Sequence, residues 1–183
     1  RSTPSNSSAA SDVYMRQYID FALEQSMLHL LEEYPKAIIL RTLSKAFGLA
    51  SLRLGFVIAS EQIIQEIEQI KSPYNVSGLS AAVGIAIMAE PELDRVLEET
   101  YASCEAIERI LAPIGKTYPS AANFVYVEYP EAERFTQRCA DAGLRIRLFD
   151  QAFRVSCGSQ EAMQVLETCV EEELRCGVAQ ANE

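Results

Sequence analysis

Arg41-Thr-Leu-Ser-Lys-Ala-Phe-Gly-Leu-Ala-Ser-Leu-Arg-Leu-Gly-Phe56 is the most informative stretch of this chain. The apolar runs on either side of its polar part, residues 37–40 and 54–59, predict two buried strands. Lys45 is therefore expected on the loop that joins these strands. Partial burial on such a loop favours the uncharged lysine amine, which is the form that attacks an aldehyde.

Groups suited to a phosphate surround Lys45 in the sequence. Arg53 begins the second predicted strand, and a guanidinium presents several donors to phosphate oxygens. Thr42 and Ser44 add two hydroxyl groups. Composition and spacing alone also allow a surface lysine and a structural arginine.

The stretch resembles the lysine motif of pyridoxal-phosphate-dependent aminotransferases of fold type I (class I/II). It is most similar to the histidinol-phosphate aminotransferase branch, which typically reads T-L-S-K-A-F-G-L-A-G-L-R-L-G. This chain differs there only by Ser51 in place of glycine. The resemblance implies that Lys45 forms the Schiff base with pyridoxal 5'-phosphate, and that Ser44 and Arg53 hold the cofactor phosphate.

Length and charge bound the remaining possibilities. The chain has 183 residues, of which 49% are hydrophobic and 23% charged, as in ordinary globular proteins. Its formal net charge of −10 argues against nucleic acid as a partner. An apolar run long enough for a membrane span is not found, which argues against a membrane partner.

The cysteines do not follow a metal-binding pattern. The five cysteines lack CxxC spacing and are odd in number, and the only histidine is His29. We interpret the cysteines as free thiols of a cytoplasmic protein, expect no metal site, and place His29 on a helix surface.

The predicted fold is α/β. The resemblance implies the second half of a large pyridoxal-phosphate-binding domain, with a mostly parallel sheet, followed by a small α+β domain. We expect a flexible leader over residues 1–13, the partial large domain over 14–105 and the small domain over 106–183. Periodicity predicts helices over 23–33, 61–70, 80–90, 92–111, 131–142 and 159–174, and further strands over 123–128, 144–147 and 153–156.

A second similarity precedes the lysine motif. Tyr18-Ile-Asp-Phe-Ala22 resembles the family segment D-E-A-Y-I-D-F-A, which implies that Tyr18 bonds the ring oxygen of the cofactor. The family aspartate that pairs with the pyridine nitrogen falls at Met15. Methionine cannot stabilise a protonated pyridine, so the ring would be a poorer electron sink in this chain.

The substrate residues follow from the same resemblance. Phe153-Arg-Val-Ser-Cys-Gly158 is similar to the family's L-R-I-[ST]-x-G, whose arginine binds a substrate carboxylate or phosphate, and this implies such a role for Arg154. Burying an arginine in a strand without an anion is costly, which favours the same role. Arg147 can assist or be structural, and Tyr74 and Asn75 are candidate wall residues or parts of a proline turn.

Two classes of function remain open. The first is an aminotransferase acting on a small anionic amino-acid-like substrate, in histidine biosynthesis, as a homodimer. The second is a truncated or degenerate homologue that serves association without turnover, favoured by Met15, by Ser51 and by the missing amino-terminal half of the family pattern. A threonine-phosphate decarboxylase-like reaction is a minor alternative.

Overall fold

The computed structural model describes residues 13–15, 17–89 and 92–180. The chain forms two compact units, and it passes from the first to the second between Val96 and Leu97, inside helix α4 (Leu93–Leu111). The domain boundary expected at 105–106 falls inside the same helix. Nearly all of the expected leader lies outside the described residues.

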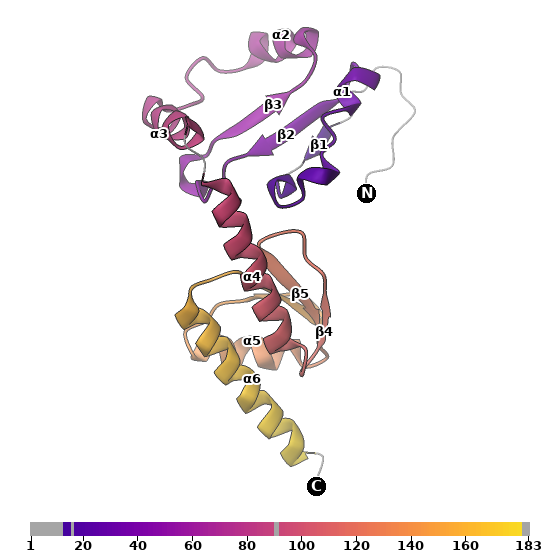
Figure 1. Ribbon diagram of the computed structural model, residues 1–183, viewed down its shortest axis with the longest axis vertical. Helices are drawn as coiled ribbons and strands as arrows, with labels where there is room; N and C mark the ends of the chain where they lie inside the picture. Colours follow the sequence, from indigo (N-terminus) through magenta and orange to yellow (C-terminus); the bar gives the residue numbers. More distant parts are fainter. Residues whose placement is uncertain (1–12, 16, 90–91, 181–183) are drawn as a thin grey trace. The chain divides into compact units, whose positions relative to one another are not determined.

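The first unit is built on a sheet of three strands (Figure 1). Its order is β1-β2-β3, with β1 parallel and β3 antiparallel to the central strand. The elements are β1 (Val13–Met15), η1 (Ile19–Phe21), η2 (Leu23–Gln25), α1 (Leu30–Glu33), β2 (Ile38–Thr42), η3 (Ala50–Leu52), β3 (Gly55–Ile58), α2 (Glu61–Ile70) and α3 (Gly78–Ala89).

The α/β class is confirmed, while the described part of this sheet is mixed where the resemblance predicts a mostly parallel one. The short connection between β2 and β3 accounts for this. Residues 43–54 contain only the 3-10 turn η3, without a crossover helix that could carry the chain back to a parallel start. The chain therefore returns antiparallel, with Arg41 opposite Phe56.

The helix predicted over residues 23–33 is wrong. The structure has a 3-10 turn at Leu23–Gln25 and a single α-helical turn at Leu30–Glu33. Ser26 separates them in extended conformation, with φ −60° and ψ 134°. Serine can hydrogen-bond nearby backbone and so competes with helix formation, which the apolar spacing does not reveal.

The helices after β3 agree well with the sequence. Helix α2 begins and ends at the predicted residues, and Ser60 precedes it in extended conformation as expected of an N-cap residue. Helix α3 is apolar on almost all sides. Only its Gly84 is buried, whereas Leu79 and Ile85 are 75% and 72% exposed in the isolated chain.

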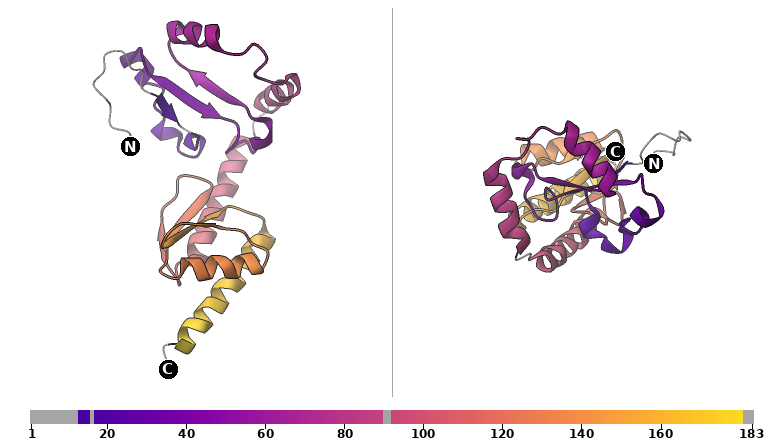
Figure 2. Two further views of the ribbon diagram at one scale, coloured as in Figure 1. Left: turned by 180° about the vertical axis from the view of Figure 1, so that it is seen from behind. Right: turned by 90° about the horizontal axis from the view of Figure 1, so that it is seen from above.

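The second unit contains a four-stranded antiparallel sheet covered by helices (Figure 2). The strand order is β4-β5-β7-β6. Its elements, besides most of α4, are β4 (Lys116–Tyr118), β5 (Phe124–Glu128), α5 (Ala132–Asp141), β6 (Arg147–Leu148), β7 (Ala152–Ser156) and α6 (Gln160–Gln180). Strand β4 was not predicted, because its three residues are too short to show an alternating pattern.

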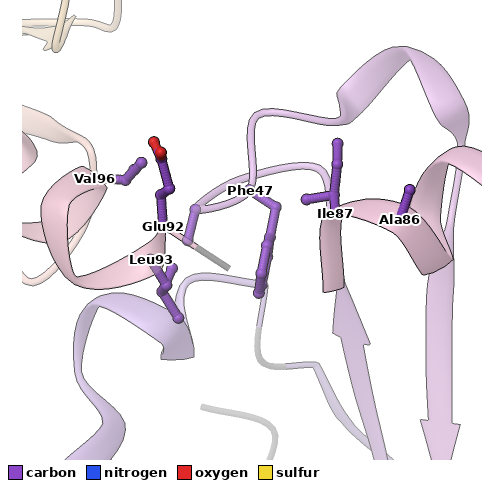
Figure 3. A pocket seen from close by; sticks show the side chains of 7 residues that line it. Phe47, Ala86, Ile87, Glu92, Leu93 and Val96 are labelled. Carbon is purple, nitrogen blue, oxygen red and sulfur yellow. The ribbon is translucent and has the colours of Figure 1, made fainter. Parts of the chain in front are cut away.

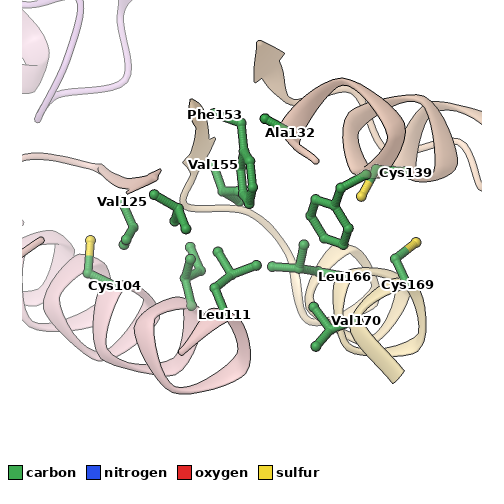
Figure 4. Packing of buried hydrophobic residues seen from close by; sticks show 13 residues of the cluster. Cys104, Leu111, Val125, Ala132, Cys139, Phe153, Val155, Leu166, Cys169 and Val170 are labelled. Atoms are coloured by element: carbon green, nitrogen blue, oxygen red, sulfur yellow. The ribbon is translucent and has the colours of Figure 1, made fainter. Parts of the chain in front are cut away.

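One hydrophobic cluster holds this unit together (Figure 4). Alternate residues of β5 and β7 point into it, and α4, α5 and α6 pack on that same sheet face. The members are Cys104, Ile107, Leu111, Val125, Val127, Ala132, Phe135, Cys139, Phe153, Val155, Leu166, Cys169 and Val170. The opposite sheet face carries Arg154 together with aromatic side chains such as Phe124 and Tyr126.

Two further features bear on the sequence expectations. Gly143 has φ +86° just after α5, the left-handed conformation that glycine commonly adopts beyond the end of a helix. Among the described helices, none has the length and apolar character needed to cross a membrane.

Candidate active site

The connection between β2 and β3 is a closed loop that carries Lys45. The Leu43 backbone N–H donates to the Leu54 carbonyl over 3.3 Å, so the two ends of the loop lie together. Gly48 donates its N–H to the Lys45 carbonyl over 3.0 Å and adopts φ +68°, which suits glycine. Leu43 and Ala46 are each only 2% exposed and anchor the loop. The placement of Lys45 on a loop between two strands is confirmed.

Two hydroxyl groups form a small network at the start of the loop. The Ser44 backbone N–H donates to Thr42 Oγ1 over 3.1 Å, and Thr42 Oγ1 lies 3.1 Å from the Leu54 carbonyl and 2.9 Å from Ser44 Oγ. A hydroxyl has one proton. If Thr42 donates this proton to the Leu54 carbonyl, it accepts a hydrogen bond from the Ser44 hydroxyl. Both lone pairs of Ser44 Oγ can then accept from another polar group.

Tyr18 and Lys45 lie together although they are far apart in the sequence. The Lys45 Nζ is 5.1 Å from the centroid of the Tyr18 ring, within the range of a cation–π contact. Tyr18 immediately precedes the turn η1, and both side chains are half-buried. The structure thus joins the tyrosine and the lysine that the two sequence similarities single out.

Arg53 sits at the other end of the same loop. Its backbone has φ +55°, in the left-handed region that non-glycine residues rarely adopt. Its guanidinium is exposed and donates to the Ala50 carbonyl over 3.1 Å. The hydrogen bond between Leu43 and Leu54 brings the two ends of the loop together. Arg53, next to Leu54, therefore lies in space at the same end of the loop as Leu43 and Ser44.

The sequence analysis missed an ion pair next to this site. Arg41 Nη1 lies 3.8 Å from Asp20 Oδ1, and Arg41 Nη2 lies 3.4 Å from Ser26 Oγ. Burial raises the pKa of Asp20, partly offset by the charge of Arg41. The pair fastens the turn after Tyr18 to strand β2. The available signal was an aspartate within the apolar run Ile19-Asp-Phe-Ala22.

A largely apolar pocket lies between the loop, helix α3 and the first turn of α4 (Figure 3). Its volume is about 410 Å³, and Phe47 stands between Ile87 of α3 and Leu93 of α4. Ala46 and Phe47, which line it, directly follow Lys45 in the sequence. The predicted polar residues are not among its lining, so this pocket and the hydroxyl network are separate features of the loop.

Some candidates stay predictions. Tyr74 is 92% exposed and Asn75 is also exposed, on the connection between α2 and α3. The backbone of Met15 lies in β1, opposite Leu40, but its side chain lies outside the described residues. Methionine in place of the family aspartate is therefore a feature of the sequence.

In the second unit, the two predicted arginines are cross-strand neighbours. Arg147 of β6 pairs directly with Arg154 of β7, which pairs on its other side with Tyr126 of β5. Directly opposed residues share a sheet face, and like charges opposed in this way repel each other. The Arg154 guanidinium stacks 4.6 Å from the centroid of the Phe124 ring. Its Nε is buried without a hydrogen-bond partner among the described residues.

A comparison with known protein families agrees with the fold and with the loop that carries Lys45. The family model described as "Aminotransferase class I and II" matches residues 16–170. The chain therefore belongs to the class I and II aminotransferase family.

Individual relatives narrow the similarity. The chain is 32% identical over 151 residues to the histidinol-phosphate aminotransferase of Thermoanaerobacter sp. (strain X514), covering 77% of this chain and 42% of that protein. It is 41% identical over 112 residues to the histidinol-phosphate aminotransferase of Thermococcus kodakarensis, covering 61% of this chain and 32% of that protein.

A solved structure agrees. Histidinol-phosphate aminotransferase from Sinorhizobium meliloti, determined in complex with pyridoxal-5'-phosphate, superposes with a TM-score of 0.80 at 26% identity. The match covers 90% of this chain and 48% of that one. The chain thus spans less than half the length of these relatives.

Proposed function

We propose that this chain is the lysine-bearing part of a pyridoxal-phosphate-dependent aminotransferase that acts on histidinol phosphate or a closely similar amino substrate, with a 2-oxo acid as the acceptor. The observation that carries this proposal is the closed β2–β3 loop, which holds Lys45 beside Tyr18 and next to the hydroxyls of Thr42 and Ser44. The family and the named relatives support it.

The residues of the first unit fit the cofactor in part. Lys45 would hold its aldehyde carbon, Tyr18 would bond its ring oxygen, and Ser44, Thr42 and Arg53 would hold its phosphate. The Arg53 guanidinium donates to a neutral acceptor, the Ala50 carbonyl, which a phosphate oxygen could replace. With Met15 where the family has aspartate, a partner for the ring nitrogen is missing from this segment.

When bound, pyridoxal phosphate supplies an aromatic ring that withdraws electrons from the substrate carbon. The protein supplies position and proton transfer. The Lys45 amine, in its free form, would take a proton from the substrate carbon and pass it to the cofactor. This is general acid–base catalysis. In the second unit, Arg154, assisted by Arg147, would bind the substrate carboxylate or phosphate. Stacking on Phe124 supports anion binding there, as does the buried Nε of Arg154, which has no hydrogen-bond partner within the described part of the chain.

Spectroscopy and an activity assay together test this proposal. Titrating pyridoxal phosphate into the chain should produce a new visible absorbance band that saturates only weakly. Transamination of histidinol phosphate should be negligible, because each missing preorganised group costs on the order of 10²-fold in rate. A chain without any cofactor-dependent band would contradict the proposed cofactor. Robust turnover would instead show that the groups present here suffice for catalysis.

The non-catalytic alternative makes a different prediction. Met15 and Ser51 favour a chain that keeps the fold for association only. Such a chain would not bind pyridoxal phosphate at all. The decarboxylase-like alternative is less favoured, because the relatives reported above are named aminotransferases.

We further propose that the chain forms a homodimer through the apolar surface of α3 and the connection before it. Besides Leu79 and Ile85, this surface includes Val76 at 49% and Met88 at 48% exposure. Soluble proteins rarely leave a contiguous surface of this kind in water. The proposal includes a cytoplasmic location, which the free state of the five cysteines supports.

Light scattering at micromolar concentration is expected to give the mass of a dimer. The double variant Leu79→Glu/Ile85→Glu should be monomeric, because it places two carboxylates in the apolar contact. Gln62→Glu/Gln65→Glu on the exposed side of α2 adds the same charge and should remain dimeric. A monodisperse wild-type monomer, or equal behaviour of the two double variants, would contradict this interface.

A further inference from the structure

Two cysteines that are distant in the sequence meet in the second unit. Cys104 lies on α4 and Cys157 directly follows β7, and their sulfur atoms are 3.3 Å apart. A disulfide bond is about 2.05 Å long, so the two atoms need to approach by only about 1 Å. Helix α4 holds the backbone of Cys104, and the Cys157 N–H donates to the Asn123 carbonyl over 2.9 Å.

We propose that Cys104 and Cys157 form a reversible disulfide, made by exchange with a low-molecular-weight disulfide such as oxidised glutathione. The proposal goes beyond the aminotransferase function and does not depend on it. It assigns a modification site to Cys157, which lies three residues after Arg154 of β7.

The surroundings decide which sulfur reacts first. The hydrogen bond from the Cys104 thiol lowers the pKa of Cys157 to about 7, although burial acts in the opposite direction. The pKa of Cys104 is raised, by its hydrogen bond to Cys157 and then by burial. Cys157 is half-buried and Cys104 only 4% exposed, so Cys157 is also the more accessible of the two.

The exchange proceeds in two balanced steps. The Cys157 thiolate attacks one sulfur of glutathione disulfide, forms a mixed disulfide and releases one glutathione thiolate. Cys104 then loses its proton to solvent, and its sulfur attacks the Cys157 sulfur and releases the second glutathione thiolate. The protein loses two protons and two electrons, and the glutathione disulfide gains the two electrons.

The other three cysteines provide matched comparisons. Cys139 and Cys169 also belong to one core cluster but are 0% and 2% exposed, and burial raises the pKa of both. They should therefore stay reduced. Cys176 is exposed and should form only a simple mixed disulfide.

The ring closure should stiffen the second unit. Positions 104 and 157 are separated by 53 residues, and a crosslink over such a distance restricts the unfolded chain strongly. The melting temperature of the oxidised unit should rise by on the order of 10 °C.

The test uses the full 183-residue chain in buffers of reduced and oxidised glutathione. Samples are quenched with acid, alkylated and mapped by mass spectrometry. Wild type should yield a crosslinked 104–157 peptide without retained glutathione at either site, and a reductant should reverse it. Cys176→Ser should behave like wild type at this pair. Cys104→Ser should instead accumulate a stable glutathione adduct at Cys157.

Two results would overturn the proposal. One is a wild-type chain that retains glutathione at Cys157, and the other is a chain in which only Cys176 reacts. The alkylation rate of wild-type Cys157 against pH gives a readout that needs no variant. It should reach half its maximum near pH 7, because that is the titration of its thiolate. A midpoint at the ordinary thiol pKa of about 8.5 would be a third contradicting result.

Discussion

Borohydride reduction of this chain in the presence of pyridoxal phosphate is expected to leave a stable pyridoxyl group on Lys45, and Lys45→Ala is expected to remove it. Lys45 is half-buried on a closed loop, its Nζ lies 5.1 Å from the centroid of the Tyr18 ring, and Ser44 precedes it in the sequence. A phosphate held by these neighbours raises the local concentration of the aldehyde at the Lys45 Nζ. Labelling of Lys45 should therefore exceed that of any other lysine by about tenfold or more.

The chain offers an internal control for this experiment. Lys36 is exposed just before β2, so Lys36→Ala removes a lysine of the same unit without touching the loop. It should leave labelling of Lys45 unchanged. Peptide mapping after reduction measures both sites at once. Equal labelling of Lys36, Lys45, Lys71 and Lys116 would mean that the loop does not recruit the cofactor.

Glu173→Ala is expected to destabilise the second unit by about 3 kcal/mol. Glu173 is 2% exposed and accepts hydrogen bonds from three side chains. The Tyr129 hydroxyl donates over 2.8 Å, Arg134 Nη2 over 2.5 Å and Arg138 Nε over 3.1 Å. Alanine removes the acceptor that the Tyr129 hydroxyl, Arg134 and the Arg138 Nε share beside the core. Thermal or urea unfolding of the second unit measures the loss.

The neighbouring acid provides the control. Glu172 pairs with Arg138 over 3.3 Å, but its side chain is 50% exposed. Exposed ion pairs contribute little, so Glu172→Ala should cost less than about 1 kcal/mol. Similar losses in Glu172→Ala and Glu173→Ala would show that the buried network does not stabilise the unit.

The same network predicts acid sensitivity. Burial by itself raises the pKa of Glu173, but the hydrogen bonds from Arg134 and Tyr129 and the nearby arginine charges lower it overall. A carboxylate whose pKa is lowered on folding stabilises the protein above its ordinary pKa of 4.5. This contribution is lost as the pH falls through the lower, folded-state pKa. The stability difference between wild type and Glu173→Gln should therefore shrink as the pH falls below 4.5.

The resemblance along Arg41–Phe56 identified the family, and simple patterns located most helices. Helix α2 has its predicted bounds because the signals that define it are local. Its isoleucines recur at helical spacing, and Ser60 directly precedes its first residue. The helix predicted over residues 23–33 is wrong because the apolar spacing within one segment did not determine its conformation. Their apolar spacing fits a helix, but the extended Ser26 and the packing of Phe21 and Ala22 decided otherwise.

The candidate site was predicted in its parts rather than in its arrangement. Lys45, Thr42, Ser44 and Arg53 follow one another closely, so one loop carries them all. Tyr18 could be named from a similarity, but its 5.1 Å distance from Lys45 depends on how η1 packs beside β2.

By itself, the sequence determined the aminotransferase family, the strand–loop–strand setting of Lys45 and the bounds of α2, because these are properties of neighbouring residues. Only the tertiary structure decided that Asp20 meets Arg41, that Arg147 lies opposite Arg154, that Cys104 touches Cys157 and that Glu173 is buried under three donors. Each of these contacts joins segments separated along the chain. Periodicity tells which face of an element is buried, but it carries no information about which distant residue completes the contact.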